Sequence, residues 1–184
     1  MTLAKTQRLT RDAWIGTGLA ALASDGPEAL RAEPLARRLG ATKGSFYWHF
    51  DDLPAYHAAL IETWEQAETA RITETLAAEE TDPSRLRRLA QIIAEDPARD
   101  GAAVEPAMRA WALGHAGAQA AVARLDAARL DRLGALLRSV GVGNPEMARI
   151  IHAAGLGMAA LAPDARGDAP GAIGSLVDLI LALR

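Results

Sequence analysis

One short segment limits what this chain can fold into: residues 39–50, Leu-Gly-Ala-Thr-Lys-Gly-Ser-Phe-Tyr-Trp-His-Phe. Gly40 offers the backbone freedom that a tight turn needs, and Thr42 is well suited to cap a helix after that turn. Phe46 and Phe50 are four residues apart, so they share one helical face that can pack into a core. The segment therefore predicts a turn followed by a short helix with one buried face.

Aromatic side chains are concentrated in and just after this segment. Of the eight Phe, Tyr and Trp residues in the chain, five fall between positions 46 and 56. The side chains on the other face of the short helix are hydrogen-bond donors or flat rings: Lys43, Ser45, Tyr47, Trp48 and His49. We interpret this face as a surface for a partner, because a packing core alone does not require so many aromatic residues here.

Length and composition describe a soluble protein. The 184 residues are half apolar, which is enough for one large domain or for a small domain joined to a medium one. No apolar run reaches the roughly 18–20 residues of a membrane span, and no secretory signal follows the first basic residues. The absence of cysteine excludes disulfides and thiolate metal sites. These features predict a cytoplasmic protein with no membrane partner.

Charge is distributed unevenly, although the formal net charge is −3. Residues 1–50 carry seven Lys or Arg and four Asp or Glu, a balance of +3, whereas the remainder has a balance of −6. A basic N-terminal block on an acidic body is typical of a protein whose N-terminal part faces a polyanion. An ordinary soluble domain is the alternative, since a balance of this size is common.

Apolar residues recur at helical spacing along the chain, and no stretch shows the sustained alternation of a strand. The pattern predicts a short basic arm, residues 1–9, followed by about nine helices. These begin near residues 10, 32, 42, 53, 82, 104, 118, 145 and 169. Loops are predicted at residues 97–101 and 163–168, where Pro, Gly and Asp are frequent. The predicted fold class is all-α.

The last predicted helix, residues 169–183, is apolar on nearly every side, interrupted by Ser175 and Asp178. A helix of this kind must be covered all round. The preceding helix carries small residues such as Gly155 and Gly157, which allow another backbone to approach. Two such helices from each of two chains can form a four-helix bundle around a two-fold axis. The alternative is a pair of ordinary core helices in a monomer.

Residues Gly26 to Phe50, and above all Thr42 to Phe50, resemble the helix-turn-helix of the TetR family of bacterial transcriptional regulators. The resemblance is strong over residues 8–60, and it rests beyond them on helix pattern and length. It implies a three-helix DNA-binding domain at residues 1–52 and a helical effector-binding and dimerisation domain at residues 53–184. It also implies a homodimer joined through the two C-terminal helices. Such a dimer binds a palindromic operator, most often as a repressor, and responds to a small-molecule effector.

In a helix-turn-helix, the N-terminal residues of the second helix reach the base edges. Thr42, Lys43 and Ser45 are therefore expected at the bases, and Lys43 suits the O6 and N7 acceptors of guanine. Gly44 allows close approach to the duplex. A backbone N–H at the start of the helix is also suited to a phosphate.

Three residues lie later on the same helix, where phosphate contacts are expected: Tyr47, Trp48 and His49. The resemblance implies backbone contacts for Tyr47 and His49. Packing of Trp48 against the next helix, and a core or capping role for His49, are the alternatives.

The sequence departs from the family pattern at two places. Arg31 stands where the family usually has a capping Thr, so we expect a longer charged side chain to reach the phosphate instead. Asp51, Asp52 and Leu53 stand where relatives commonly have a Lys that touches DNA. These acids weaken the expected phosphate affinity. A dimeric interaction protein that kept the fold without binding DNA therefore remains an alternative.

The resemblance further implies an effector site between the helices predicted after residue 53. Four residues on apolar stripes are the candidates for its wall: Trp64, Met108, Trp111 and His115. Ordinary core packing is the alternative for each of them. No residue pattern identifies the effector.

Enzymatic function has little support in the sequence. The four histidines are scattered, no His-Glu-x-x-His pattern occurs, and no glycine loop follows a strand. We therefore predict no catalytic residue, no cofactor and no metal site. A small helical enzyme that uses His115 or His152 is the remaining alternative.

Overall fold

The computed structural model describes residues 9–95 and 104–184, and these residues form helices and no strand. The helices are α1 (Arg11–Asp25), the 3₁₀ turn η1 (Pro27–Ala29), α2 (Ala32–Arg38), α3 (Lys43–Phe46), α4 (Leu53–Ala77), α5 (Asp82–Ala94), α6 (Val104–Ala112), α7 (Ala116–Ser139), α8 (Glu146–Ala160), α9 (Pro163–Arg166) and α10 (Ala169–Ala182). The all-α prediction is confirmed for this part of the chain. Most of the predicted basic arm and the predicted loop at 97–101 lie outside the described residues.

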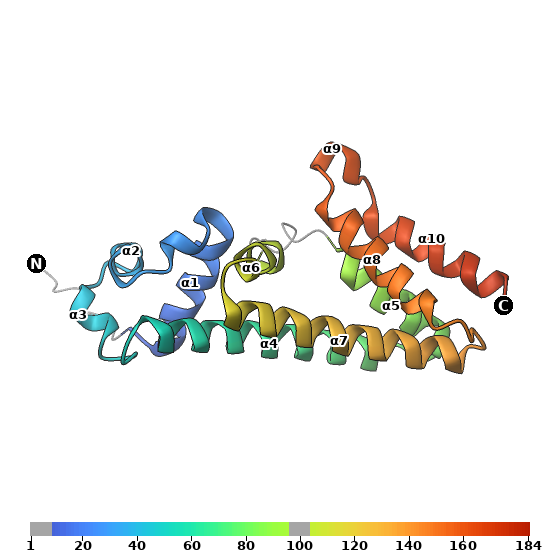
Figure 1. The fold of residues 1–184 in the computed structure, drawn as a ribbon, viewed down its shortest axis with the longest axis horizontal. Helices are drawn as coiled ribbons and strands as arrows, with labels where there is room; N and C mark the ends of the chain where they lie inside the picture. Colours follow the sequence, from blue (N-terminus) through green and yellow to red (C-terminus); the bar gives the residue numbers. More distant parts are fainter. Residues whose placement is uncertain (1–8, 96–103) are drawn as a thin grey trace, which may run out of the picture.

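The molecule is elongated because two long helices, α4 and α7, run side by side along its length (Figure 1). At one end, α1, α2 and α3 form a small head, and α1 packs against both α4 and α6. At the other end, α5, α8 and α10 pack together. Since α4 contacts α1 as well as α7, it joins the head to the body. The domain boundary at residues 52 and 53 stays a prediction.

Most helix ends follow the capping chemistry of the sequence. The Thr10 hydroxyl accepts from the N–H of Ala13 at the start of α1, at 3.2 Å. The Asp52 carboxylate accepts from the N–H of Ala55 at 2.7 Å and begins α4, as predicted. Such caps satisfy backbone donors that have no partner inside the helix. Gly26 ends α1 with φ of 78°, a conformation that favours glycine.

Two details differ from the sequence prediction. Residues 163–166, predicted as part of a polar loop, form the single turn α9, in which the N–H groups of Ala165 and Arg166 both donate to the carbonyl of Ala162. Proline in the first helical position favours such a turn because its φ is already helical. The helix predicted from residue 42 is also shorter than expected, since α3 ends at Phe46 and isolated turns lead on to Phe50.

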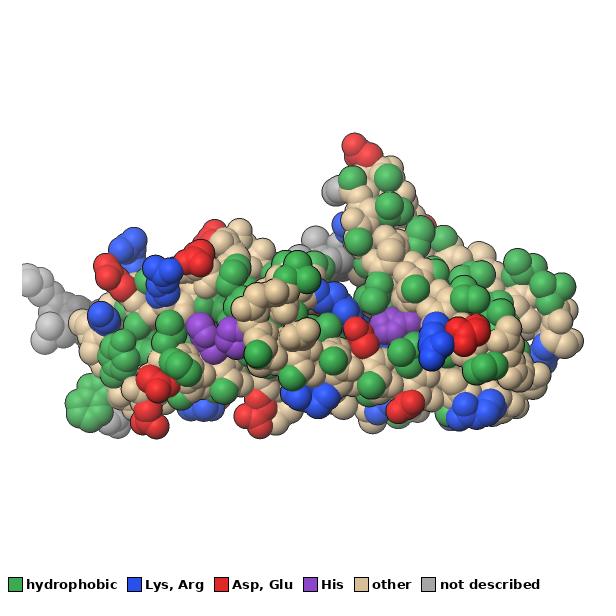
Figure 2. All heavy atoms as spheres, in the orientation of Figure 1, with side chains coloured by type: hydrophobic (Ala, Val, Ile, Leu, Met, Phe, Trp, Pro, Cys, Tyr) green, Lys and Arg blue, Asp and Glu red, His purple; other side chains and the backbone are tan. Residues whose placement is uncertain are grey.

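Two exposed stripes run along α8 and α10. On α8 an exposed stripe at helical spacing is formed by Ile150, Ala153, Gly157 and Ala160, and the exposed ion pair of Glu146 and Arg149 lies at its N-terminal end. On α10 they do the same: Ala172, Ser175, Leu179 and Ala182, followed by Leu183. Figure 2 shows hydrophobic side chains (green) over this end of the molecule. Gly155 faces the other way, because a Cβ there would lie 2.8 Å from Ile93 of α5.

Candidate nucleic-acid interface

The turn before α3 sets the direction of this short helix. Gly40 takes φ of 61°, in the left-handed region that suits glycine. The Thr42 hydroxyl then accepts from the N–H of Ser45 at 3.2 Å and caps α3. The predicted turn and cap are therefore both present, and α3 begins at Lys43 with its first turn facing solvent.

An aromatic core holds α3 against the other helices of the head. Phe46 is fully buried, and its ring centroid lies 5.5 Å from that of Trp14 and 5.1 Å from that of Tyr56. Phe50 packs edge-to-face on Tyr56 at 4.8 Å, and the Tyr56 hydroxyl donates to the Trp14 carbonyl at 3.0 Å. Much of the aromatic concentration around residue 50 is thus packing. The prediction that Phe46 and Phe50 pack into a core is confirmed, and Tyr56 belongs to the same core.

The opposite face of this segment presents polar groups and rings to solvent. Trp48 has 88% of its surface exposed and Tyr47 has 49%. Lys43 is exposed and has no ion-pair partner among the described residues. The exposure of Trp48 excludes the alternative that it packs against α4. Adjacent exposed rings with polar groups around them are typical of an interaction surface.

The other residues of this segment that we expect to contact DNA are less exposed than Trp48 or lack a side chain. Gly44 is exposed, and a Cβ at this position would have only the Thr42 hydroxyl as a neighbour, at 3.8 Å. Ser45 and His49 are half-buried. The His49 ring lies 6.5 Å from the rings of Trp14 and Phe50, at the edge of the aromatic core. His49 is therefore neither fully buried nor free.

The charged groups around α2 are partly neutralised by neighbouring acids. Arg31 is the N-cap of α2 without a side-chain cap hydrogen bond, and its guanidinium pairs with Glu28. Each of the two side chains is well exposed, at 65% and 81%. Exposed pairs of this kind contribute about 0–1 kcal/mol, so Arg31 can exchange its partner at low cost.

The arginines at the other end of α2 also pair with acids, and an acid at the start of α4 caps that helix. Arg38 pairs with Asp25, while Arg37 lies 3.4 Å from Glu33. The carboxylate of Asp52, which we expected to weaken phosphate binding, is already engaged as the α4 cap.

Comparison with solved structures places this head and body in a known arrangement. A proposed transcriptional regulator from Saccharomonospora viridis, crystallised with choline, has a TM-score of 0.76 and 15% identity over 94% of this chain and 95% of that chain. A proposed TetR-family regulator from Rhodococcus sp. has a TM-score of 0.73 and 20% identity over 93% and 98%. The chain has the TetR-type regulator fold.

A transcriptional regulator from Rhodococcus sp. Rha1 gives the same TM-score of 0.73 and 20% identity, with 95% of each chain covered. No family model matches the sequence. No curated protein matches it either. The three similar structures are described as transcriptional regulators and not as enzymes. In the described part of the chain, no helix is both long and apolar enough to cross a bilayer.

The four predicted effector residues occupy different places in the helical body. Trp64 and Met108 are buried in the core, at 3% and 0% exposure. Trp111 is nearly buried but lines a surface groove where α6 meets the head. His115 caps α7, since its Nδ1 accepts from the N–H of Ala118 at 3.2 Å. Effector contact by these residues stays a prediction.

A buried ion cluster lies in the body, and the sequence analysis did not anticipate it. Its central residues come from α4, α6, α7 and α8: Glu68, Glu105, Arg109, Asp126, Arg129 and His152. Glu68 also pairs with Arg71 of α4, at 2.9 Å. The Arg129 side chain is 0% exposed and donates to both oxygens of Glu105, at 2.7 and 2.9 Å. Arg109 bridges Glu105 and Asp126 at 2.8 and 2.6 Å. The cluster therefore connects α6 to α7 through the interior.

Some polar atoms of this cluster have no hydrogen bond. They are Nε of Arg129 and both ring nitrogens of His152. The Nε2 atom of His152 lies 3.2 Å from Asp126 but outside hydrogen-bond geometry. Burial lowers the pKa of His152. The negative charge of Asp126 opposes this shift and the positive charge of Arg129 adds to it, so the imidazole is neutral near pH 7. Among the described residues, no group of three or more His, Asp or Glu side chains could hold a metal ion.

The ion cluster predicts how stability depends on acid. Burial alone raises the pKa of Glu105, but the hydrogen bonds and charges of Arg129 and Arg109 outweigh it and lower the pKa from 4.5 to about 2. The contribution of Glu105 to folding is therefore complete above about pH 4.5 and is lost as the pH falls toward 2. The Glu105→Gln variant should have a lower free energy of unfolding than the native chain at pH 7. On acidification its free energy of unfolding should fall by less than that of the native chain. Urea unfolding between pH 3 and 7 measures this, and an unchanged acid slope in the variant would contradict it.

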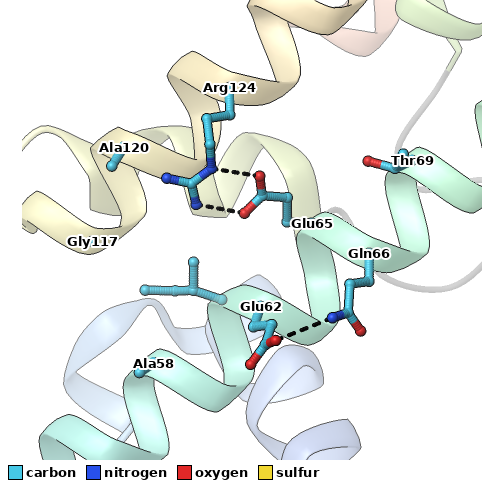
Figure 3. Close-up of a pocket in the computed structure, with 9 residues that line it drawn as sticks. Ala58, Glu62, Glu65, Gln66, Thr69, Gly117, Ala120 and Arg124 are labelled. Atoms are coloured by element: carbon cyan, nitrogen blue, oxygen red, sulfur yellow. Dashed lines mark hydrogen bonds and ion pairs between the residues drawn. The ribbon is translucent and has the colours of Figure 1, made fainter.

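A second groove lies between α4 and α7 on the surface of the body, with a volume of about 710 Å³ (Figure 3). Arg124 of α7 reaches across to α4 and donates to both oxygens of Glu65, at 2.7 and 2.6 Å. Gln66 donates to Glu62 at 3.1 Å on the same side of α4. Small residues on both helices, such as Gly117, leave room for this groove. None of the four predicted effector residues lines it.

Proposed function

We propose that this chain is a homodimeric, ligand-responsive transcriptional regulator that binds a palindromic operator through α2 and α3. The observation that carries the proposal is the solvent-facing Lys43, Tyr47 and Trp48 on a segment anchored by buried Phe46 and Phe50. A rigid helix with free donors on its outer face is what a major groove accepts. Such a regulator acts in the cytoplasm, and repression is the expected output.

Each residue of the surface has a proposed role. Thr42, Lys43 and Ser45 contact base edges, while Gly44 permits close approach of the backbone. The phosphate contacts come from four residues: Arg31, Tyr47, Trp48 and His49. Arg31 can leave its exposed pair with Glu28 for a phosphate at little cost.

The test is selection of binding sites from a random double-stranded DNA pool by the purified protein. A regulator of this kind should enrich duplexes with two half-sites related by a dyad. Enrichment of no sequence would refute the proposal and favour the alternative of an interaction protein without DNA binding. Exposed Asp51 would then be the feature to replace.

The proposed dimer forms through α8 and α10. Their outward stripes are apolar or small, and Leu179 and Leu183 remain 56% and 79% exposed in the single chain. Asp178, the acidic residue of α10, is exposed beside this stripe, and its charge is paired with Arg87 of α5. Burying both stripes against a second copy removes this apolar surface from water.

Leu179→Asp should dissociate the dimer, because it would bury an unpaired carboxylate at the centre of the proposed contact. We expect the sedimentation velocity of the variant to change from that of two chains to that of one. Leu113→Asp is the matched control, since Leu113 is 92% exposed after α6 and lies away from α10. A dimer that persists in Leu179→Asp with an affinity equal to the control would contradict this interface.

An effector that binds the body would act by favouring one separation of the two heads. The choline complex of the Saccharomonospora viridis protein supports a ligand-responsive role. The α4–α7 groove is a candidate site, because it is of the size that small molecules occupy. It contains no aromatic ring, whereas rings are the usual partners of quaternary ammonium groups. Choline itself is therefore not the ligand that we propose for this groove.

A further inference from the structure

A groove of about 400 Å³ lies where the head meets the body. One wall belongs to the head and carries Glu28, Leu30 and Arg31. The other belongs to α4 and α6 and carries His57 and Trp111. Figure 2 shows histidine side chains (purple) reaching the surface between the head and α6. Pockets of this volume at a junction between two bodies are common sites for small ligands.

The inner part of the groove is aromatic. The His57 ring lies edge-on to Trp111 at 5.1 Å between centroids, and His115 lies 4.3 Å from Trp111 on a tilted plane. The Nε2 atom of His57 is 3.1 Å from the carbonyl of Leu30 and donates to it. Burial lowers the pKa of His57; the hydrogen bond to Leu30 opposes this shift and the nearby His115 adds to it, so the His57 imidazole is neutral near pH 7. The lining therefore suits an uncharged aromatic ring.

The rim of the groove presents one cation and one anion, three residues apart. Arg31 and Glu28 pair with each other, but both side chains are more than half exposed, so the pair is weak. A ligand that carries both a carboxylate and an ammonium can replace this single pair by two. The carboxylate suits the forked donors of Arg31, and the ammonium suits the oxygens of Glu28. An anion alone would meet the charge of Glu28, and a cation alone would meet that of Arg31.

From these features we propose that the groove is a binding site for a zwitterionic aromatic α-amino acid. Its ring lies along Trp111 and His57, its carboxylate binds Arg31, and its ammonium binds Glu28. The site also has a regulatory consequence, which rests on the proposed function. Because Arg31 is a proposed phosphate contact, an amino acid that holds Arg31 competes with DNA for the same guanidinium. By linkage, operator DNA should weaken amino acid binding by the same factor.

The test is isothermal titration calorimetry of the full chain without DNA, at pH 7.5, using L-tryptophan as the probe. Two analogues each lack one charge: tryptamine lacks the carboxylate and indole-3-propionate lacks the ammonium. We expect L-tryptophan to bind at least about tenfold more tightly than either analogue, since a hydrogen bond to a charged group contributes about 1.5–3 kcal/mol. No detectable binding of L-tryptophan, or equal binding of the three probes, would overturn the proposal.

Two surface variants assign the charges. Arg31→Gln should weaken L-tryptophan by about tenfold without weakening tryptamine, and Glu28→Gln should weaken L-tryptophan without weakening indole-3-propionate. Arg138→Gln, an exposed cation at the far end of α7 that lines neither groove, is the control and should bind as the native chain does. An equal loss for L-tryptophan and tryptamine in Arg31→Gln would also overturn the proposal. These results do not depend on DNA, so they stand apart from the outcome of site selection.

Discussion

Replacing Arg129 by methionine should lower the free energy of unfolding by about 3–5 kcal/mol, the largest effect that we expect from a single substitution in this chain. The Arg129 side chain is fully buried and holds both oxygens of Glu105, with Glu68 at 3.5 Å. Methionine fills much of the same space but leaves these carboxylates with less compensating charge. Urea unfolding at pH 7 measures the loss, provided that the transition stays two-state.

Two further variants identify burial as the reason for this effect. Arg124→Met removes a bidentate pair with Glu65 on the surface, where the arginine side chain is 60% exposed. It should cost no more than about 1 kcal/mol. The double variant Arg129→Met with Glu105→Gln should lose less stability than the sum of the losses of the two single variants, because it no longer contains the uncompensated carboxylate of Glu105. A cost for Arg129→Met as small as that of Arg124→Met would contradict the interior location of the cluster.

Gly18→Ala should also be strongly destabilising, by about 3 kcal/mol, through overpacking of the head. A Cβ at Gly18 would overlap the Tyr56 hydroxyl and lie 2.6 Å from the nearest methyl of Leu60. The Tyr56 ring cannot move aside freely, since it is fully buried and its hydroxyl donates to the Trp14 carbonyl. Helix α1 must therefore shift away from α4. Thermal unfolding followed by circular dichroism reports the change.

Gly16→Ala provides the matched control on the same helix. Gly16 is exposed, and nothing lies within 4 Å of the position of its Cβ. Alanine is a better helix former than glycine by up to about 1 kcal/mol, so this variant should be slightly more stable than the native chain. If both alanine variants had the same melting temperature, the close packing of α1 on α4 would be wrong.

Features set by neighbouring residues could be predicted from the sequence. The Thr42 and Asp52 caps depend on groups three residues away, and both are present. Phe46 and Phe50 could be assigned to the core because their spacing places them on one helical face. Once these two rings face inward, the outward direction of Lys43 and Tyr47 follows from helix geometry.

Features that depend on distant residues could not be predicted in the same way. The inward face of Phe46 was predictable, but its contact with Trp14 was not, because Trp14 comes from another helix. The ion pair between Arg129 and Glu105 joins residues 24 positions apart. The i,i+4 spacing of Glu105 and Arg109 on α6 was a local signal for part of the ion cluster, but its burial depends on α7 and α8. The groove at the head–body junction likewise depends on Leu30 meeting His57 across 27 positions.

The central claim is that the exposed face of α3 binds DNA. The measurement that tests it most directly is fluorescence anisotropy of the purified protein on DNA flanking its own gene, at several salt concentrations. Native protein is compared with a double variant, Lys43→Ala with Tyr47→Phe, which keeps the Tyr47 ring on Phe46. Arg138→Ala, an exposed cation at the far end of α7, is the control.

We expect tight binding by the native protein and the control, with affinity that falls steeply as salt rises because phosphate contacts release counterions. The double variant should lose about a hundredfold or more in affinity, since a good base contact such as that of Lys43 contributes about 1–3 kcal/mol and a hydrogen bond from Tyr47 to a charged phosphate about 1.5–3 kcal/mol. Equal affinity of the double variant and the native chain on the same duplex would contradict the claim that this face reads DNA.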